Sequence, residues 1–193
     1  LGEYKVRGEL RTLEPDKNEG VKVGVFTVDC FRVTHSVPDS VGFCITTPVG
    51  KFFHVPDYKF DWTPVDQKPF DIAKAALLAK DGVVSLASDC LGATSEDYTK
   101  SEIDIEKNIE LLIEKAPQRV IFTTLSSNIS RMQQAIRASS NLGRKVVLIG
   151  RSVETKAEIA KNLGYLNWGG GVVINHKEAR KIPKNKLTYI VSG

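Results

Sequence analysis

Apolar residues follow two different patterns along the chain, and the pattern changes near Ser95. In the earlier part, short apolar runs are separated by turns rich in Pro, Gly and Asp, which predicts strands joined by tight connections. These runs cover residues 21–33, 41–47, 51–55 and 83–87, and residues 48–50 are expected to close a hairpin. The first part of the chain is therefore predicted to be strand-rich.

One helix is predicted within this strand-rich part. Residues 71–80 are rich in Ala and Leu, which favour helical backbone, and Asp81-Gly82 follows as a stop signal.

After Ser95, helical and strand-like patterns alternate. Helices are expected from a cap at Ser101 to Pro117, around Ile129 to Leu142, and from Ser152 to Leu163. The runs expected to form strands are residues 119–124, 145–149 and 187–191. Repeated strand–helix–strand units predict a parallel sheet flanked by helices, so the fold class is α/β.

Composition and charge restrict the functional classes only mildly. The chain has 193 residues, of which 41% are hydrophobic, and a net charge of +4 that permits contact with RNA without requiring it. No apolar run reaches the roughly 20 residues that span a bilayer, and no signal peptide opens the chain, so we expect a cytoplasmic protein without a membrane partner. Cys30, Cys44 and Cys90 are far apart and are expected to be buried thiols.

Two polar segments follow strand-like runs and carry candidate chemistry. Residues 31–40 have the sequence FRVTHSVPDS, and residues 54–61 have the sequence HVPDYKFD. His35 and Asp57 therefore stand where strands are predicted to open into loops, the places where functional groups concentrate. Imidazole and carboxylate groups are suitable ligands for Zn²⁺ or Mn²⁺.

The two segments resemble motifs of the metallo-β-lactamase superfamily, in its ribonuclease J branch, where a THS-x-PDS stretch is followed by GD-x-KFD. Residues 123–131, TTLSSNISR, are similar to the TTFSSN-x-x-R element of the same branch. The resemblance implies that residues 1–94 are part of a metallo-β-lactamase domain and that residues 95–193 are part of a β-CASP domain. The HxHxDH motif and the C-terminal histidine motifs of the family are missing, so we expect an internal fragment.

The resemblance assigns His35 and Asp57 as metal ligands, with Asp57 also catalytic as the carboxylate that bridges two divalent ions, Zn or Mn, in the intact enzyme. The residues alone favour a different interpretation, in which a single His after a strand is a hydrogen-bonded core residue. Two ligands cannot close a metal site, so the fragment is not expected to hold metal tightly or to be active by itself.

Asp89 resembles the acidic residue of the first β-CASP motif, which implies a catalytic role in proton transfer beside the metals. An equally supported alternative is a turn aspartate that caps the following loop, because Cys90-Leu91-Gly92 departs from the family's Ser-Thr-Asn.

The turn formed by Ser126, Ser127 and Asn128 is the candidate binding site for an RNA phosphate. A helix that begins directly after a strand presents free N–H groups and a positive dipole end to an anion. The alternative is that these residues only cap the helix.

Together, the sequence and the resemblance predict a metal-dependent ribonuclease that hydrolyses RNA phosphodiester bonds from the 5′ end, with internal cleavage left open. The expected partners are RNA and further copies of the same chain. Two alternatives stay open. One is a non-catalytic RNA-binding or scaffold homologue, motivated by Pro56 in place of the family's glycine; the other is a different hydrolase of the superfamily.

Overall fold

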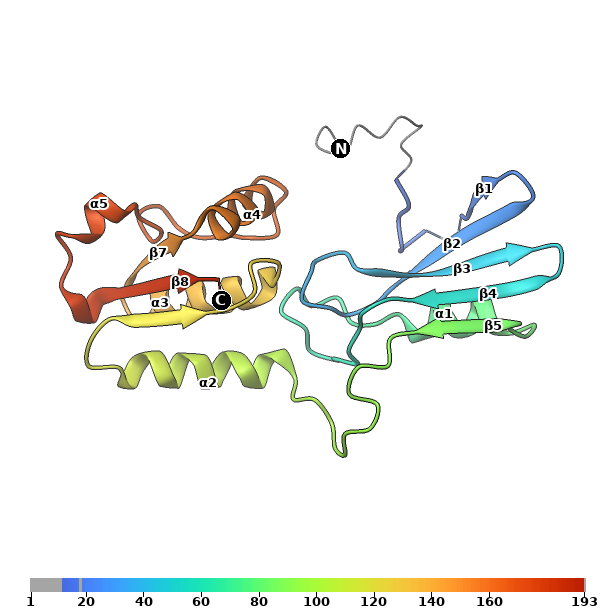
Figure 1. Cartoon of the computed structure of the whole chain (residues 1–193), viewed down its shortest axis with the longest axis horizontal. Helices are drawn as coiled ribbons and strands as arrows, with labels where there is room; N and C mark the ends of the chain where they lie inside the picture. The colour runs from blue at the N-terminus through green and yellow to red at the C-terminus, as the bar shows by residue number, and fades with distance from the viewer. Residues whose placement is uncertain (1–11, 18, 193) are drawn as a thin grey trace. The chain divides into compact units, whose positions relative to one another are not determined.

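The computed structural model describes residues 12–17 and 19–192, which form two compact units (Figure 1). The first unit comprises the described residues up to Val33, together with Val41–Tyr58 and Asp71–Ala93. The second comprises Thr34–Ser40, Lys59–Phe70 and the described residues from Thr94 onward. The domain boundary at residue 94 stays a prediction, and residues 1–11 and 193, at the outer ends of the two predicted domains, lie outside the described chain.

The first unit is built on a five-stranded sheet in the order β1-β2-β3-β4-β5. Strands β1 to β4 are antiparallel neighbours, whereas β5 runs parallel to β4. The elements are β1 (Val21–Val23), β2 (Phe26–Arg32), β3 (Val41–Thr47), β4 (Gly50–Val55), α1 (Ile72–Ala79) and β5 (Ser85–Ser88). The predicted hairpin is confirmed, because Thr47 pairs with Gly50 across its turn.

The apolar run expected over residues 21–33 is divided into two strands, so the expectation of a single run is wrong. Gly24 adopts a φ of +61° and Val23 pairs with Phe26, which closes a tight hairpin between β1 and β2. Glycine adopts positive φ without a steric penalty, so the turn forms at this residue.

The core of the first unit contains aromatic rings and thiols. The Phe31 and Phe53 rings lie 5.7 Å apart, and Cys30 and Cys44 are buried beside them in the sheet. Burial raises the pKa of both thiols, because the thiolate loses its hydration. Cys90 is exposed, so the expectation that all three cysteines are buried is wrong for this residue.

The second unit contains a three-stranded parallel sheet in the order β6-β8-β7, which confirms the predicted α/β class. Its strands are β6 (Val120–Thr123), β7 (Lys145–Ile149) and β8 (Leu187–Val191). Its helices are α2 (Glu102–Lys115), α3 (Ile129–Asn141), α4 (Arg151–Asn162), the short α5 (His176–Ala179) and a 3₁₀ turn at Lys184–Lys186. No helix among the described residues is both long and apolar enough to cross a membrane.

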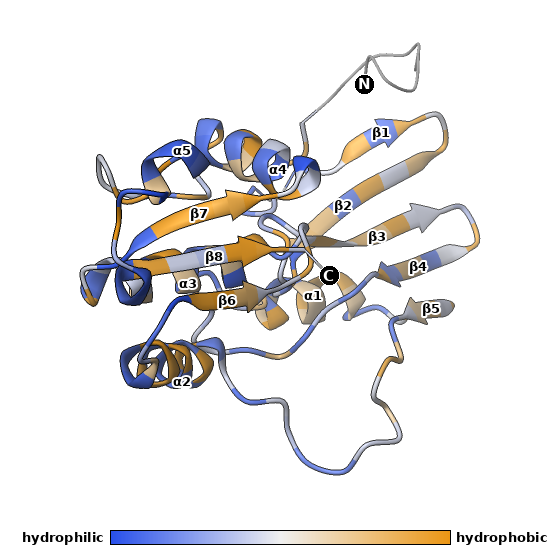
Figure 2. Cartoon of the chain, turned by 60° about the vertical axis from the view of Figure 1, so that its left-hand side comes forward, coloured by the Kyte–Doolittle hydropathy of each residue, from blue (hydrophilic) through white to orange (hydrophobic). Residues whose placement is uncertain are grey.

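Helices α3 and α4 cover one face of this parallel sheet. Met132 and Ile136 of α3 and Val153 of α4 pack with Val146 and Ile190 from the strands, and all five are almost fully buried. Figure 2 shows β7 and β8 as largely hydrophobic strands, as expected for a sheet whose face is covered by helices.

Arg144, just before β7, is a buried cation that joins the end of α2 to the sheet. Its guanidinium donates hydrogen bonds to the carbonyl oxygens of Ile113 (3.1 Å) and Ala116 (2.7 Å) at the end of α2. It also donates to the carbonyls of Gln118 (3.0 Å) and Leu187 (3.4 Å). The last carbonyls of a helix lack intrahelical donors and carry partial negative charge, so a buried arginine is well matched to them.

We therefore expect Arg144→Met to lower the free energy of unfolding by about 3 kcal/mol, because several buried carbonyls would lose their donor. Urea denaturation of the chain, followed by tryptophan fluorescence, measures this change, since Trp62 and Trp168 both belong to the second unit. The exposed Arg119→Met is the matched control and should change stability by less than about 0.5 kcal/mol. Equal stability of the two variants would contradict the role assigned to Arg144.

Candidate functional site

A buried carboxylate organises the loops of the second unit. Asp61 lies in the loop Lys59–Phe70, is 2% exposed, and accepts three hydrogen bonds. The donors are the Ser101 hydroxyl (2.8 Å), the Glu102 N–H (2.8 Å) and the Thr63 N–H (3.0 Å). Asp61 therefore provides the acceptor at the start of α2, although it precedes that helix by about 40 positions.

Ser101 occupies the predicted cap position, but its side chain makes no cap bond to the helix. Its hydroxyl donates to Asp61 instead. The cap expected from Ser101 is thus replaced by one from a distant loop, because a carboxylate is a stronger acceptor for helix N–H groups than a hydroxyl.

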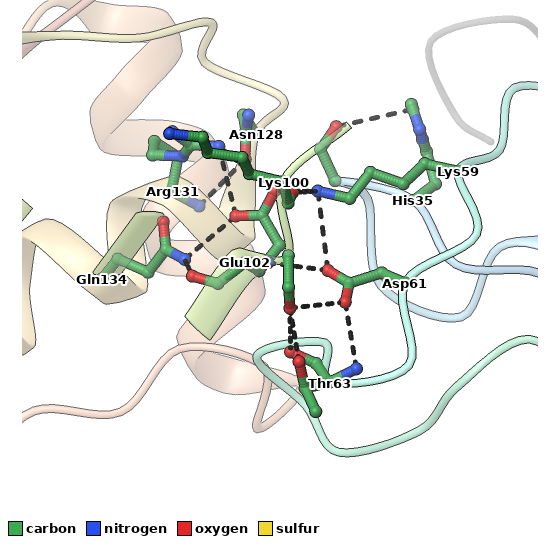
Figure 3. A network of polar contacts seen from close by, with 11 residues as sticks. His35, Lys59, Asp61, Thr63, Lys100, Glu102, Asn128, Arg131 and Gln134 are labelled. Atoms are coloured by element: carbon green, nitrogen blue, oxygen red, sulfur yellow. Dashed lines mark hydrogen bonds and ion pairs between the residues drawn. The ribbon is translucent and has the colours of Figure 1, made fainter. Parts of the chain in front are cut away.

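Glu102 extends this network to α3. Its carboxylate accepts hydrogen bonds from Lys59 Nζ (2.7 Å), Arg131 Nη2 (3.1 Å) and Gln134 Nε2 (3.0 Å), which converge on it in Figure 3. Lys59 also lies 3.5 Å from Asp61, so one lysine bridges both acidic groups. The opposite charges offset the desolvation cost of burying this cluster.

Burial alone would raise the pKa of the Asp61 carboxyl. Hydrogen bonds from the Glu102 N–H, the Ser101 hydroxyl and the Thr63 N–H, with the charge of Lys59, more than offset burial and hold the pKa below its ordinary value. Asp61 is therefore ionised in the folded chain across the neutral range.

His35 lies in the loop Thr34–Ser40 of the same unit and is half-buried. Its ring Nε2 is 3.5 Å from the Ser36 hydroxyl. Both flanking residues are held by backbone hydrogen bonds: the Thr34 carbonyl accepts from the Lys59 N–H (2.9 Å), and the Ser36 carbonyl accepts from the Ser130 N–H (3.4 Å). The His35 loop is therefore fixed to the Asp61 loop and to the first turn of α3.

A cavity of about 120 Å³ adjoins these loops. Thr34, which lines it, is 7% exposed and its hydroxyl makes no hydrogen bond in the described structure. The remaining wall is formed by His35, Ser36, Lys59, Asp61, Pro64, Val65, Asp66, Glu102 and Ser130. The imidazole thus borders a small cavity within the second unit that has both polar and apolar walls.

Asp57 belongs to the first unit, where it is exposed and follows the end of β4. Pro56 stands just after the last residue of β4, so its missing N–H does not interrupt the paired strand. Asp89 follows β5, and its carboxylate accepts a hydrogen bond from the Leu91 N–H (2.8 Å). This hydrogen bond is the one expected if Asp89 is a turn aspartate that caps the following loop. The catalytic role of Asp89 stays a prediction.

Among the described residues, no group of three or more His, Cys, Asp or Glu side chains is arranged to hold a metal ion. His35 carries an imidazole nitrogen and Asp57 carries carboxylate oxygens, and both are suitable ligand atoms for Zn²⁺ or Mn²⁺. Their assignment as ligands stays a prediction.

The predicted phosphate site lies where β6 leads into α3, and the structure adds two residues to it. The half-buried Ser126 hydroxyl is 2.8 Å from the Ser152 hydroxyl and accepts from Lys156 Nζ (2.9 Å). Ser152 and Lys156 belong to α4, which begins after β7 without a side-chain cap. Parallel strands end at the same edge of a sheet, so the starts of α3 and α4 and the side chain of Lys156 lie together there. The sequence pattern of α4 alone did not indicate that this helix contributes to the phosphate site.

The expectation of free N–H groups at the start of α3 is wrong. The Asn128 N–H donates to the Leu125 carbonyl and the Ile129 N–H donates to the Ser127 carbonyl. The Asn128 side chain caps the Arg131 N–H at 2.9 Å. An anion at this turn would therefore contact the Ser126 and Ser127 hydroxyls and Lys156 rather than the backbone of α3.

Comparison with known proteins identifies relatives along the whole chain. Residues 117–193 match the family model "Ribonuclease J, beta-CASP domain". A ribonuclease J of Thermus thermophilus is 38% identical over 185 residues, which are 95% of this chain and 32% of that protein. A ribonuclease J of Helicobacter pylori is 35% identical over 192 residues, 100% of this chain and 28% of that protein. The chain thus spans about a third of the length of these curated relatives.

A solved structure shares the fold. A protein of unknown function from Enterococcus faecalis superposes with a TM-score of 0.62 at 18% identity, covering 97% of this chain and 45% of that one. At this identity the similarity concerns the fold alone.

The depressed pKa of Asp61 predicts how stability depends on pH. The unfolded carboxyl has a pKa of about 3.9, and the folded one lies lower, so its stabilising contribution is present above about pH 4 and is lost as the pH falls through the folded value. Asp61→Asn should lower the free energy of unfolding at pH 7 by roughly 2 kcal/mol and flatten its decline below about pH 4.

Urea titrations at a series of pH values measure this dependence. The matched control is Asp104→Asn, in the first turn of the same helix, where the side chain is 56% exposed. An Asp61→Asn profile that runs parallel to the wild-type profile would show that Asp61 does not carry the effect.

Proposed function

Because this chain belongs to the ribonuclease J family, we propose that the protein containing it is a metal-dependent ribonuclease that hydrolyses RNA phosphodiester bonds from the 5′ end, with internal cleavage left open. The observation that carries this proposal is identity of 35–38% to ribonuclease J proteins over almost the whole chain. The β-CASP match in the second unit and the loops that hold His35 support it.

His35 and Asp57 are the proposed metal ligands, through an imidazole nitrogen and carboxylate oxygens. Two divalent cations, Zn or Mn, would supply an activated water for attack on phosphorus. The chain's own contribution is to present these donors on loops held by backbone hydrogen bonds, as for the residues flanking His35. Asp89, at the end of β5, is the proposed group for proton transfer.

The proposed phosphate site uses Ser126, Ser127 and Asn128. The Ser126 hydroxyl already meets Ser152 and Lys156, so a cation and two hydroxyls converge at the carboxyl edge of the sheet. Asn128 holds the turn by capping α3. The proposed ligand is the 5′ phosphate or a backbone phosphate of RNA, which hydroxyl donors and a lysine bind well.

Asp57→Ala in the full-length protein should reduce RNA hydrolysis by roughly a thousandfold or more, because a proposed metal ligand would be lost. The fold should persist, since Asp57 is exposed. Single-turnover cleavage of a labelled RNA measures the effect, with Asp104→Ala as the control. Cleavage at the wild-type rate in Asp57→Ala would remove Asp57 from the mechanism. A wild-type protein that binds RNA but neither binds metal nor cleaves would instead support the scaffold alternative.

The paired change Ser126→Ala with Ser127→Ala should weaken binding of 5′-phosphorylated RNA by about tenfold, which is about 1.4 kcal/mol, and leave 5′-hydroxyl RNA less affected. Fluorescence anisotropy at fixed salt measures both affinities. Ser140→Ala, an exposed serine near the end of α3, is the control. If the paired variant loses only stability and keeps its preference for the 5′ phosphate, the serines serve the turn alone.

A further inference from the structure

We propose that Asp61 is a positioning residue, which fixes the loops Thr34–Ser40 and Lys59–Phe70 against the start of α2 and thereby holds His35 in place for the reaction. This inference rests on the proposed function, because it assigns His35 a ligand role. It concerns a different residue, which is neither a proposed metal ligand nor part of the proposed phosphate site.

The first support is the completeness of the Asp61 contacts. A buried carboxylate is costly unless hydrogen bonds and a countercharge replace its hydration. Asp61 has both, through Ser101, Glu102, Thr63 and Lys59. The loop therefore has one strongly favoured position relative to α2.

The second support is that α2 does not need a distant cap. Ser101 stands at the N-cap position with extended backbone, where its own hydroxyl could accept from the helix. The hydroxyl instead donates to Asp61. The hydrogen bond between Ser101 and Asp61 thus links α2 to the loop Lys59–Phe70, although α2 could begin without this link.

The third support is the connection from this link to His35. The N–H of Lys59, two positions before Asp61, donates to the carbonyl of Thr34, the residue before His35. Lys59 is held at its other end by Glu102, which also binds Arg131 of α3. A shift of the Asp61 loop would therefore displace the backbone on which His35 stands.

The test separates capping from positioning with a double variant of the full-length protein. Asp61→Ala removes the link, and Ser101→Asp in the same chain gives α2 a cap of its own. We expect the unfolding midpoint to return close to the wild-type value. Amide hydrogen exchange in Thr34–Ser40 and Lys59–Phe70 should nevertheless be about tenfold faster than in the wild type.

The kinetic expectation is a split between kcat and KM. In the double variant, kcat for RNA cleavage should fall by about 10- to 100-fold, as for loss of residues that orient metal ligands, while KM changes by less than about threefold. Asp104→Ala, in the first turn of α2 and with an exposed side chain, is the matched control and should leave both exchange and kinetics unchanged.

If exchange and kcat both return to wild-type values together with stability, Asp61 is only a helix cap and the inference is overturned. Exchange does not depend on activity, so it decides the loop's position even if the wild-type protein fails to cleave RNA. In that case the proposed function fails separately.

Discussion

The bonds that Asp61 accepts at the start of α2 are the constraint on which the second unit's candidate site depends. A carboxylate that is 2% exposed cannot be left partly satisfied, because an unpaired buried charge is far more costly than a lost surface contact. Its three donors come from its own loop and from Ser101 and Glu102. The loop and the helix are therefore positioned together.

The two ends of α2 are held by groups of opposite charge that lie far away in the sequence. Asp61 accepts from the first turn, and Arg144 donates to carbonyls of the last turn. Each charge matches the partial charge of the helix end it contacts. Since Arg144 also reaches Leu187 of β8, the same helix connects the loops around His35 with the parallel sheet.

The candidate chemistry of the second unit uses two features of α/β architecture. Loops attached to a rigid scaffold carry the proposed ligand His35, and the common edge of parallel strands gathers Ser126, Ser152 and Lys156. The serine at the start of α4 and the one after β6 are 26 positions apart in sequence, yet their hydroxyls are 2.8 Å apart. This edge of the sheet therefore offers hydroxyl and ammonium donors, although the N–H groups at the start of α3 already have acceptors.

Local sequence determined the elements whose formation needs only near neighbours. The runs 145–149 and 187–191 are strands with those bounds, and the expected α/β class is present, because periodicity and breaking residues act within a few positions. The motifs around His35, Asp57 and residues 123–131 also indicated the family, since they are contiguous in sequence.

Tertiary structure alone decided the partners of polar groups. Ser101 had the pattern of a cap, but Asp61 supplies the acceptor; Ser130 lies in the first turn of α3, but its N–H donates to the carbonyl of Ser36 in a distant loop. Cys90 is apolar enough for a core, yet it lies on an exposed loop. Hydrogen bonds and burial depend on which distant segments meet, and periodicity carries no information on that pairing. Sequence thus indicated most of the elements, and the packing of loops 34–40 and 59–70 decided which side chains lie near His35.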